Sequence, residues 1–216
     1  LSRGLGDVYK RQLAGQLTIA ASLTTSAYVV PRAVARLKDG RPEASVELRT
    51  ANTFDVAEMV KNDVADVGII EGDIDRPELV VTPFAQDRLI CVAPARHRFC
   101  GKAIAPQDVY GETLLVREDG SGTRQAVLAA LDSHAFHFER IVHFGTSEAS
   151  KAGVANGIGI AWVPAISVAA ELGTTLCELK FDTPPILRSF SYVRRRDTQL
   201  TPLGDEFVTL LKALYE

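Results

Sequence analysis

Residues 117–124, Arg-Glu-Asp-Gly-Ser-Gly-Thr-Arg, combine the residue types that bind an anion at the start of a helix. They follow an apolar run at 113–116 that is typical of a strand, and they precede an apolar run at 125–131 that is typical of a helix. The first N–H groups of a helix have no partners inside the helix, and the helix dipole adds positive charge there. The order strand, turn, helix therefore predicts a seat for an anion.

Side chains of the same turn add donors to this backbone. Ser121 and Thr123 carry hydroxyl groups, and Arg117 or Arg124 would supply a charge-assisted hydrogen bond. The structural alternative is a capped helix whose glycines only form the turn. A phosphate-binding P-loop is excluded, because no Gly-Lys-Ser/Thr follows at the required spacing.

Three other turns have similar chemistry. Each places hydroxyl or amide side chains between a strand-like run and a helix-like run. Ligands of open α/β sheets bind outside the carboxyl ends of the strands, where such turns lie. We therefore expect the turns to converge on one cleft between two lobes and to bind a small anion there. The predicted ligand-binding residues are Ser22, Thr24, Thr25, Asn52, Ser121, Thr123, Arg124, Thr146 and Ser147.

The turns recur because two halves of the chain share one plan of strand, turn, helix, strand, turn, helix and strand. Further apolar runs predict two strands between the halves, one last strand, and a final helix that begins at Pro202. The expected strands lie at 17–21, 46–49, 67–70, 79–81, 89–93, 113–116, 141–144, 158–163 and 188–193. This alternation predicts an α/β protein with parallel sheets.

The plan restarts after Asp87, which predicts two lobes. We expect residues 13–84 and 197–216 in the first lobe and residues 87–193 in the second. The crossovers near 85–86 and 194–196 should act as a hinge. Residues 1–12 do not fit the pattern and look like translated sequencing-adapter read-through, so they are left out of the fold prediction.

Composition narrows the class of protein. Of the 216 residues, 46% are hydrophobic and 24% are charged, which is typical of a globular protein. A net charge of −3 gives no electrostatic footprint for nucleic acid. The three cysteines, Cys91, Cys100 and Cys177, are widely spaced, so neither a zinc site nor a disulfide framework is indicated, and a reducing cytoplasm fits best. No membrane span, metal site or cofactor is expected.

The order of several motifs resembles one family. They cover the chain from about Gly15 to its end, and the turn at 117–124 is most similar to regulators of sulfur assimilation and carbon fixation. The matching segments are 15–22, the helix with Pro31, 68–72, 83–89, 117–124, 147–149 and 157–160. On these residues the chain resembles the effector-binding domain of LysR-type transcriptional regulators.

The resemblance implies a type 2 periplasmic-binding-protein fold, with two Rossmann-like lobes joined by two crossover strands and a cleft for a small effector. It implies that Ser22, Thr24, Thr25 and Ser147 contact the effector. DNA would be bound only by an N-terminal helix-turn-helix module that this chain lacks. Such domains form homodimers, tetramers in the full-length protein, here with the helix at 27–38 against the helix at 123–132 of its mate. Alternatively, these two helices simply face their own sheets.

Two other functions fit parts of the sequence. A transporter's solute-binding protein has the same fold, but the segment from Asp87 to Arg98 and the helix with Pro31 favour the regulator. A hydrolase would use Ser121 with His134, His137 or His143 as base. The Gly-x-Ser-x-Gly nucleophile elbow is absent and no orienting acid can be placed, so we expect no enzyme.

Overall fold

The computed structural model describes residues 15–215, so the expectation for residues 1–12 lies outside the described part of the chain. The chain divides into two units: unit 1 ends at Ala85 and resumes at Ser189, and unit 2 runs from Gln86 to Arg188. Residues 189–193, expected in the second lobe, lie in unit 1 because residues 190–193 pair with a strand of that unit. The hinge stays a prediction.

The sheet of unit 1 contains strands in the order β2 (Ser45–Ala51), β1 (Gln16–Ser22), β3 (Val67–Glu71) and β10 (Ile186–Arg195). Strand β1 is parallel to both β2 and β3, whereas β10 is antiparallel to β3. The parallel β1–β3 pairing brings the carboxyl ends of both strands to the same edge of the sheet. The turn that follows β1 therefore lies beside the last residue of β3.

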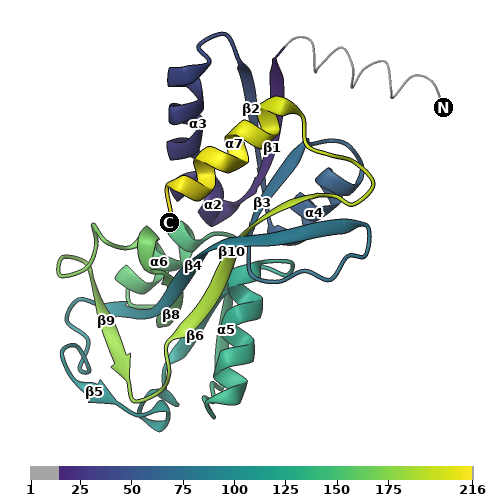
Figure 1. Cartoon of the computed structure of the whole chain (residues 1–216). Helices are drawn as coiled ribbons and strands as arrows, with labels where there is room; N and C mark the ends of the chain where they lie inside the picture. The colour runs from purple at the N-terminus through teal and green to yellow at the C-terminus, as the bar shows by residue number, and fades with distance from the viewer. Residues whose placement is uncertain (1–14, 216) are drawn as a thin grey trace. The chain divides into compact units, whose positions relative to one another are not determined.

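Helices cover both faces of this sheet (Figure 1). Leu17 and Ile19 of β1 pack in one core cluster with α3 and α7, while Ala20 packs in another with α4. This alternation follows from the strand's two-residue side-chain period. The helices of unit 1 are α2 (Leu23–Tyr28), α3 (Val30–Gly40), α4 (Thr53–Lys61) and α7 (Pro202–Ala213).

Pro31 lies in the first turn of α3, directly after the short helix α2. Proline is tolerated there because the first N–H groups of a helix need no partner inside the helix. Val30, Ala33 and Leu37 of α3 are buried in the core of unit 1. The apolar stripe of α3 therefore faces its own sheet.

In unit 2 the strands follow the order β4 (Leu79–Pro94), β8 (Ile160–Pro164), β6 (Thr113–Arg117) and β7 (Arg140–Phe144). Of β4, residues 86–94 lie in this unit. Strand β6 is parallel to β7 and β8, and β4 is antiparallel to β8. Two strands extend this arrangement, because β9 pairs with β4 and β5 pairs with β9. Their bounds are Leu176–Phe181 for β9 and Ala103–Ile104 for β5.

Alternate residues of β6 again face two different helices. Leu114 packs in one cluster with Val127 of α5, and Leu115 packs in another with Val154 of α6. The helices of unit 2 are α5 (Gly122–Ser133), α6 (Ser147–Ala155) and the 3₁₀ turns η1 (Pro106–Val109) and η2 (Ala165–Ser167). Both polar turns of this unit therefore connect a strand of the sheet to a helix on one of its faces.

Two predictions about strands were wrong. The runs at 79–81 and 89–93 belong to one strand, β4, because proline fits an extended backbone and the pairings with β8 and β9 begin only at Leu89, beyond Pro83. Strands β5 and β9 were missed. Their pairing partners lie far away in the sequence, so no local pattern indicates them.

The expectation for the cysteines was also wrong. Cys100 and Cys177 form a disulfide, with a Cα–Cα distance of 5.9 Å across 77 residues of sequence. Pairing of β9 with the end of β4 sets Cys177 opposite Ala93, and the loop after Pro94 brings Cys100 back to the same place. Cys91 is a free and buried thiol.

Within residues 15–215, the helices are all too short or too polar to cross a membrane.

Candidate ligand-binding site

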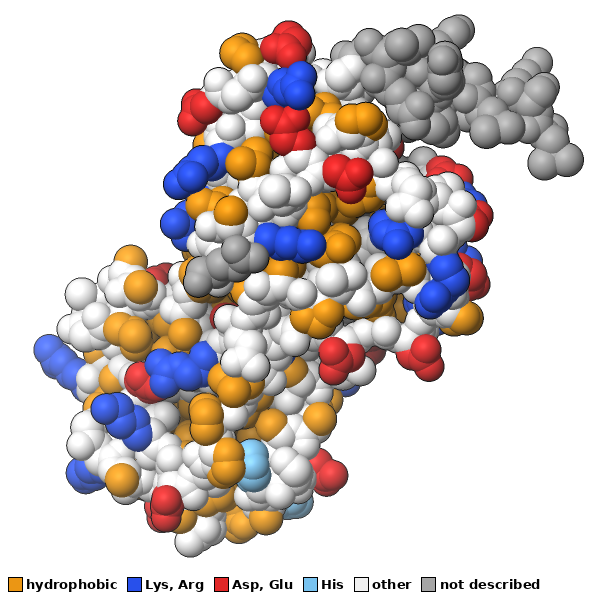
Figure 2. Space-filling model, viewed as in Figure 1, with side chains coloured by type: hydrophobic (Ala, Val, Ile, Leu, Met, Phe, Trp, Pro, Cys, Tyr) orange, Lys and Arg blue, Asp and Glu red, His pale blue; other side chains and the backbone are white. Residues whose placement is uncertain are grey.

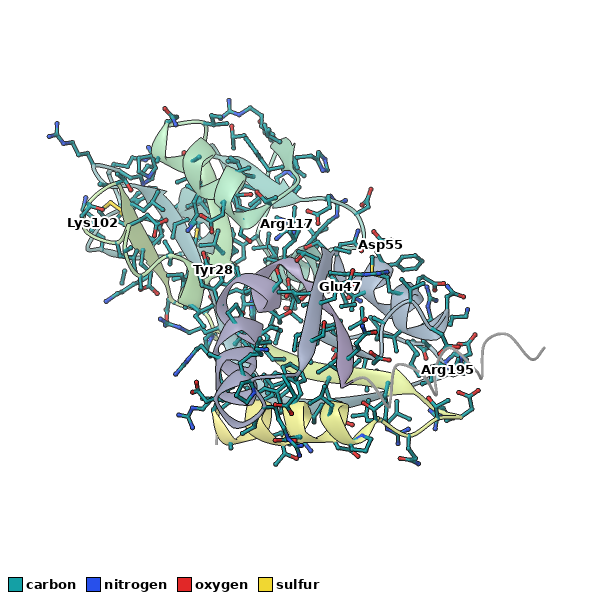
Figure 3. The ribbon with its side chains drawn as sticks, turned by 90° about the horizontal axis from the view of Figure 1, so that it is seen from above. Tyr28, Glu47, Asp55, Lys102, Arg117 and Arg195 are labelled. Carbon is teal, nitrogen blue, oxygen red and sulfur yellow. A yellow bond between two sulfur atoms is a disulfide. The ribbon has the colours of Figure 1, made fainter. Side chains whose placement is uncertain are left out.

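Arg117 and Ser147 form a buried polar contact in unit 2. Arg117 ends β6 and is 3% exposed, and Ser147 begins α6 and is 9% exposed. The guanidinium Nη1 of Arg117, which is labelled in Figure 3, donates to Ser147 Oγ at 3.0 Å. Its Nε and Nη2 donate to the two carboxylate oxygens of Glu118 at 2.7 and 2.8 Å. The buried cation is therefore paired on one side and bonded to a hydroxyl on the other.

This contact determines what the hydroxyl of Ser147 can do. Its oxygen accepts from Arg117, so its own hydrogen is left to donate. Within residues 15–215 the structure shows no acceptor for that hydrogen. A cavity of about 10 Å³, enough for one water-sized group, is lined by both residues. A hydroxyl donor at a helix start, next to a buried cation, favours an anionic oxygen as its partner.

Three of the predicted residues are helix caps. Ser121, Thr146 and Asn52 each precede a helix and accept the N–H of the residue three positions further on, at 3.4, 2.9 and 2.9 Å. Capping satisfies one of the unpaired N–H groups of each helix. The side-chain oxygens of these three residues therefore serve as helix caps, which was the structural alternative to anion binding. Their contact with a ligand stays a prediction.

Arg124 stabilises the turn itself. Its Nη1 donates to the carbonyl of Arg117 at 3.1 Å and lies 3.0 Å from Nδ1 of His143. Its Nη2 lies 3.1 Å from the exposed carboxylate of Asp119. Gly120 supports this turn with a φ of +81°, which glycine adopts without strain. The guanidinium of Arg124 is thus bonded within the turn and paired with an acidic neighbour, and its contact with a ligand stays a prediction.

Thr123 is tied to a buried ion pair. Its Oγ1 accepts from Nη1 of Arg188 at 2.7 Å. Two other nitrogens of Arg188 lie 2.8 and 2.6 Å from the carboxylate of Asp87, and both side chains are almost fully buried. The sequence analysis did not predict that Arg188 and Asp87 contact this turn. Arg188 is 65 positions from Thr123 and 101 from Asp87, so no local pattern in the sequence indicates these contacts.

The polar turn of unit 1 surrounds a carboxylate that sequence reasoning missed. Ser22 Oγ donates to Glu71 Oε2, and Thr24 Oγ1 donates to Glu71 Oε1 at 3.1 Å. Thr25 Oγ1 donates instead to the main-chain carbonyl of Ile69 at 2.8 Å. Glu71 is 1% exposed. The fold thus brings Ser22, Thr24 and Thr25 together, but their hydroxyl hydrogens already have acceptors inside unit 1.

This arrangement bears on the expected anion chemistry, and contact of Ser22 and Thr24 with a ligand stays a prediction. We expected Ser22 and Thr24 to offer neutral donors to an anion. A buried carboxylate between them takes those donors, and a second anion beside it would meet like charge. Only the position of Glu71 at the end of the neighbouring parallel strand could have indicated this. That the four turns share one ligand stays a prediction.

The described residues contain no group of three or more His, Cys, Asp and Glu side chains that could hold a metal ion. His134 and His137 follow the C-terminal end of α5, at the other end of the helix from Ser121, and His143 contacts the side chain of Arg124. Within residues 15–215, the hydroxyl oxygen of Ser121 caps α5 and makes no hydrogen bond to a histidine, so the hydrolase arrangement is not assembled.

The two α/β units define a ligand-binding architecture, and comparison with known proteins identifies its family. A family model described as the LysR substrate binding domain matches residues 10–216. The chain therefore belongs to the LysR substrate-binding domain family. Its fold is the type 2 periplasmic-binding-protein-like fold of that family, and the transporter alternative is set aside.

Individual relatives agree with this assignment. The transcriptional regulator CysL of Bacillus subtilis is 30% identical over 204 residues, which cover 94% of this chain and 68% of the relative. CbbR of Xanthobacter flavus is 30% identical over 198 residues, covering 90% and 60%. The chain thus spans about two thirds of the length of such relatives. The regulatory domain of Synechocystis CcmR, solved in complex with 2-PG, is 26% identical with a TM-score of 0.85, covering 94% of this chain and 98% of that one.

Proposed function

We propose that this chain is the effector-sensing part of a transcriptional regulator and that its effector is a small anion. The observation that carries the proposal is the contact between Arg117 and Ser147. It places a hydroxyl donor without an acceptor in the described structure at the first residue of α6, beside a buried cation. Solved domains with the same fold bind 2-PG, shikimate and benzoate, which supports this class of ligand.

The electrostatics of unit 2 support an anion more than those of unit 1. In unit 1 the donors of the polar turn are taken by Glu71. In unit 2 Ser147 is the first residue of α6, at the positive end of that helix, and it contacts the cation of Arg117. Glu118 neutralises only part of that charge because it is itself 28% exposed. A carboxylate or oxyanion would accept the hydroxyl hydrogen of Ser147.

The test is a thermal-shift screen of small anions, including sulfate, phosphate, benzoate and shikimate. A ligand that binds only the folded state raises the apparent melting temperature. We expect at least one anion to raise it in the parent and to raise it less in Ser147→Ala. Ser133→Ala is the matched control, because this hydroxyl is exposed and bonds only to the carbonyl of Ala130. An equal response of all three proteins would contradict the proposal.

The remaining parts of the function concern the whole regulator. We propose that the chain is not an enzyme, that it works in the cytoplasm, and that DNA is bound by a helix-turn-helix module outside this chain. Its net charge of −3 supports the last point. A gel-shift experiment with the chain alone should show no sequence-specific binding to the promoter upstream of its own gene. Specific binding there would contradict it.

The chain is also proposed to form a homodimer through the 27–38 and 123–132 helices. The buried residues of α3 and α5 face their own sheets, so the contact would use other residues. Leu128 of α5 and Ile141 of β7 support it, because both are large hydrophobic side chains exposed at 37% and 49%. Sedimentation at tens of micromolar, a rough scale for weak interfaces, should show a dimer that Leu128→Asp weakens; a monomer in the parent would contradict it.

A further inference from the structure

Unit 2 contains a pocket of about 410 Å³ on the face of its sheet that bears α5. Its walls are parts of β4, β8 and β9, the end of α5, and the loop before β10. The lining includes Arg88, His134, Phe136, Trp162, Lys180 and Phe181. None of the predicted ligand-binding residues lines it. The volume falls in the range of small-molecule sites, which is about 300–1,000 Å³.

Three aromatic side chains form its apolar wall. Phe136 meets the rings of Trp162 and Phe181 edge-on, with centroids 5.2 and 4.9 Å apart. Trp162 and Phe181 are stacked, with an angle of 20° between their planes. Rings fixed edge-on to each other in this way leave flat faces and edges for another planar ring. The wall therefore suits a flat apolar body.

Two polar groups at the pocket have no partner in the described structure. Nδ1 of His134 is buried and makes no hydrogen bond within residues 15–215. Lys180 is exposed, and the described residues offer its ammonium no ion pair or hydrogen bond. Buried polar atoms without partners are uncommon and call for an explanation such as a ligand. Glu178, the carboxylate in the lining, lies 3.6 Å from the guanidinium of Arg88, which offsets its charge.

From these observations we propose that the pocket is a second ligand site, which takes a small aromatic carboxylate. The ring lies against Phe136, Trp162 and Phe181, and the carboxylate faces Lys180 and His134. Cys91 also lines the pocket, but burial raises the pKa of its thiol well above the ordinary value, so the site binds without covalent chemistry. Figure 2 shows hydrophobic side chains gathered next to a histidine on the surface of this unit.

Trp162 makes the proposal directly measurable, because it is the single tryptophan of the chain. Titration of the full chain with benzoate should change the tryptophan emission with saturation. Lys180→Met should weaken benzoate binding about tenfold, the loss of one charge-assisted contact. It should leave the binding of benzyl alcohol, which has the ring without the charge, unchanged. Lys102→Met is the matched control, since Lys102 is another exposed lysine of unit 2 that points away from the unit (Figure 3).

The variants separate this pocket from the site at Ser147. Trp162 also borders the small cavity beside Ser147, so Ser147→Ala is measured in parallel. We expect Ser147→Ala to keep the component of benzoate binding that Lys180→Met weakens, with its emission change, because that component belongs to the pocket and not to the effector site. Three results would each overturn the proposal: no saturable change with benzoate, parent-like affinity in Lys180→Met, or loss of the signal in Ser147→Ala. Calorimetry on the same proteins measures any benzoate binding that does not change the tryptophan emission.

Discussion

Arg117 and Ser147 are separated by 30 positions in the chain, yet the guanidinium of one donates to the hydroxyl of the other at 3.0 Å. The parallel pairing of β6 with β7 causes this contact. It places the ends of both strands at one edge of the sheet, so the last residue of β6 meets the first residue of the helix that follows β7. A buried cation thereby orients a donor at a helix start.

Glu71 should matter for the stability of unit 1. Glu71→Ala removes the buried carboxyl to which the hydroxyls of Ser22 and Thr24 donate, and we expect the free energy of unfolding to fall by about 1–3 kcal/mol. Urea unfolding followed by circular dichroism measures it. Glu206→Ala is the control: its ion pair with Arg41 is largely exposed, so it should change stability by less than about 1 kcal/mol. Equal effects of the two changes would show that Glu71 is not needed to hold this turn.

The disulfide should stabilise unit 2 in oxidising buffer. Its loop of 77 residues restricts the unfolded chain, so Cys100→Ser combined with Cys177→Ser should lower the free energy of unfolding by about 4.5 kcal/mol on the chain-entropy estimate. Thiol titration of the unfolded, unreduced parent should find one free thiol, that of Cys91. Three free thiols in protein that was never exposed to reductant would contradict the bond.

Burial of Cys91 should make stability fall in alkali. Desolvation raises the pKa of the Cys91 thiol well above its ordinary value of 9.0 in the folded state, while the unfolded thiol keeps that value. The folded state therefore holds the proton more tightly, and its contribution to stability is full below pH 9.0 and is lost as pH rises beyond it.

The comparison for this pH effect is Cys91→Ala. Urea unfolding at neutral pH and above pH 9.0 should show a larger loss in the parent than in Cys91→Ala, because only the parent carries the thiol. Iodoacetamide should likewise leave Cys91 unmodified in the folded protein at neutral pH, since the thiolate is the reactive form. Rapid modification of the folded protein would mean that the thiol is accessible and ionised.

Local patterns in the sequence predicted the elements well and the long-range chemistry poorly. The apolar residues of β1 and the polar turns before α5 and α6 are local signals, and these three elements begin within three residues of their expected places. The role of Glu71 depends on a partner 49 positions away, and the disulfide on one 77 positions away. Residue spacing in the sequence does not indicate these two contacts, because they form only when distant strands pair.

The central claim is that Ser147 donates to the anionic effector. Isothermal titration calorimetry with the best anion from the thermal screen, on the parent, Ser147→Ala and Ser133→Ala, tests it most directly. Loss of one hydrogen bond to a charged acceptor costs about 1.5–3 kcal/mol, so Ser147→Ala should bind roughly ten- to a hundredfold more weakly. Ser133→Ala should bind like the parent. A folded Ser147→Ala protein that binds the anion as tightly as the parent would contradict the account.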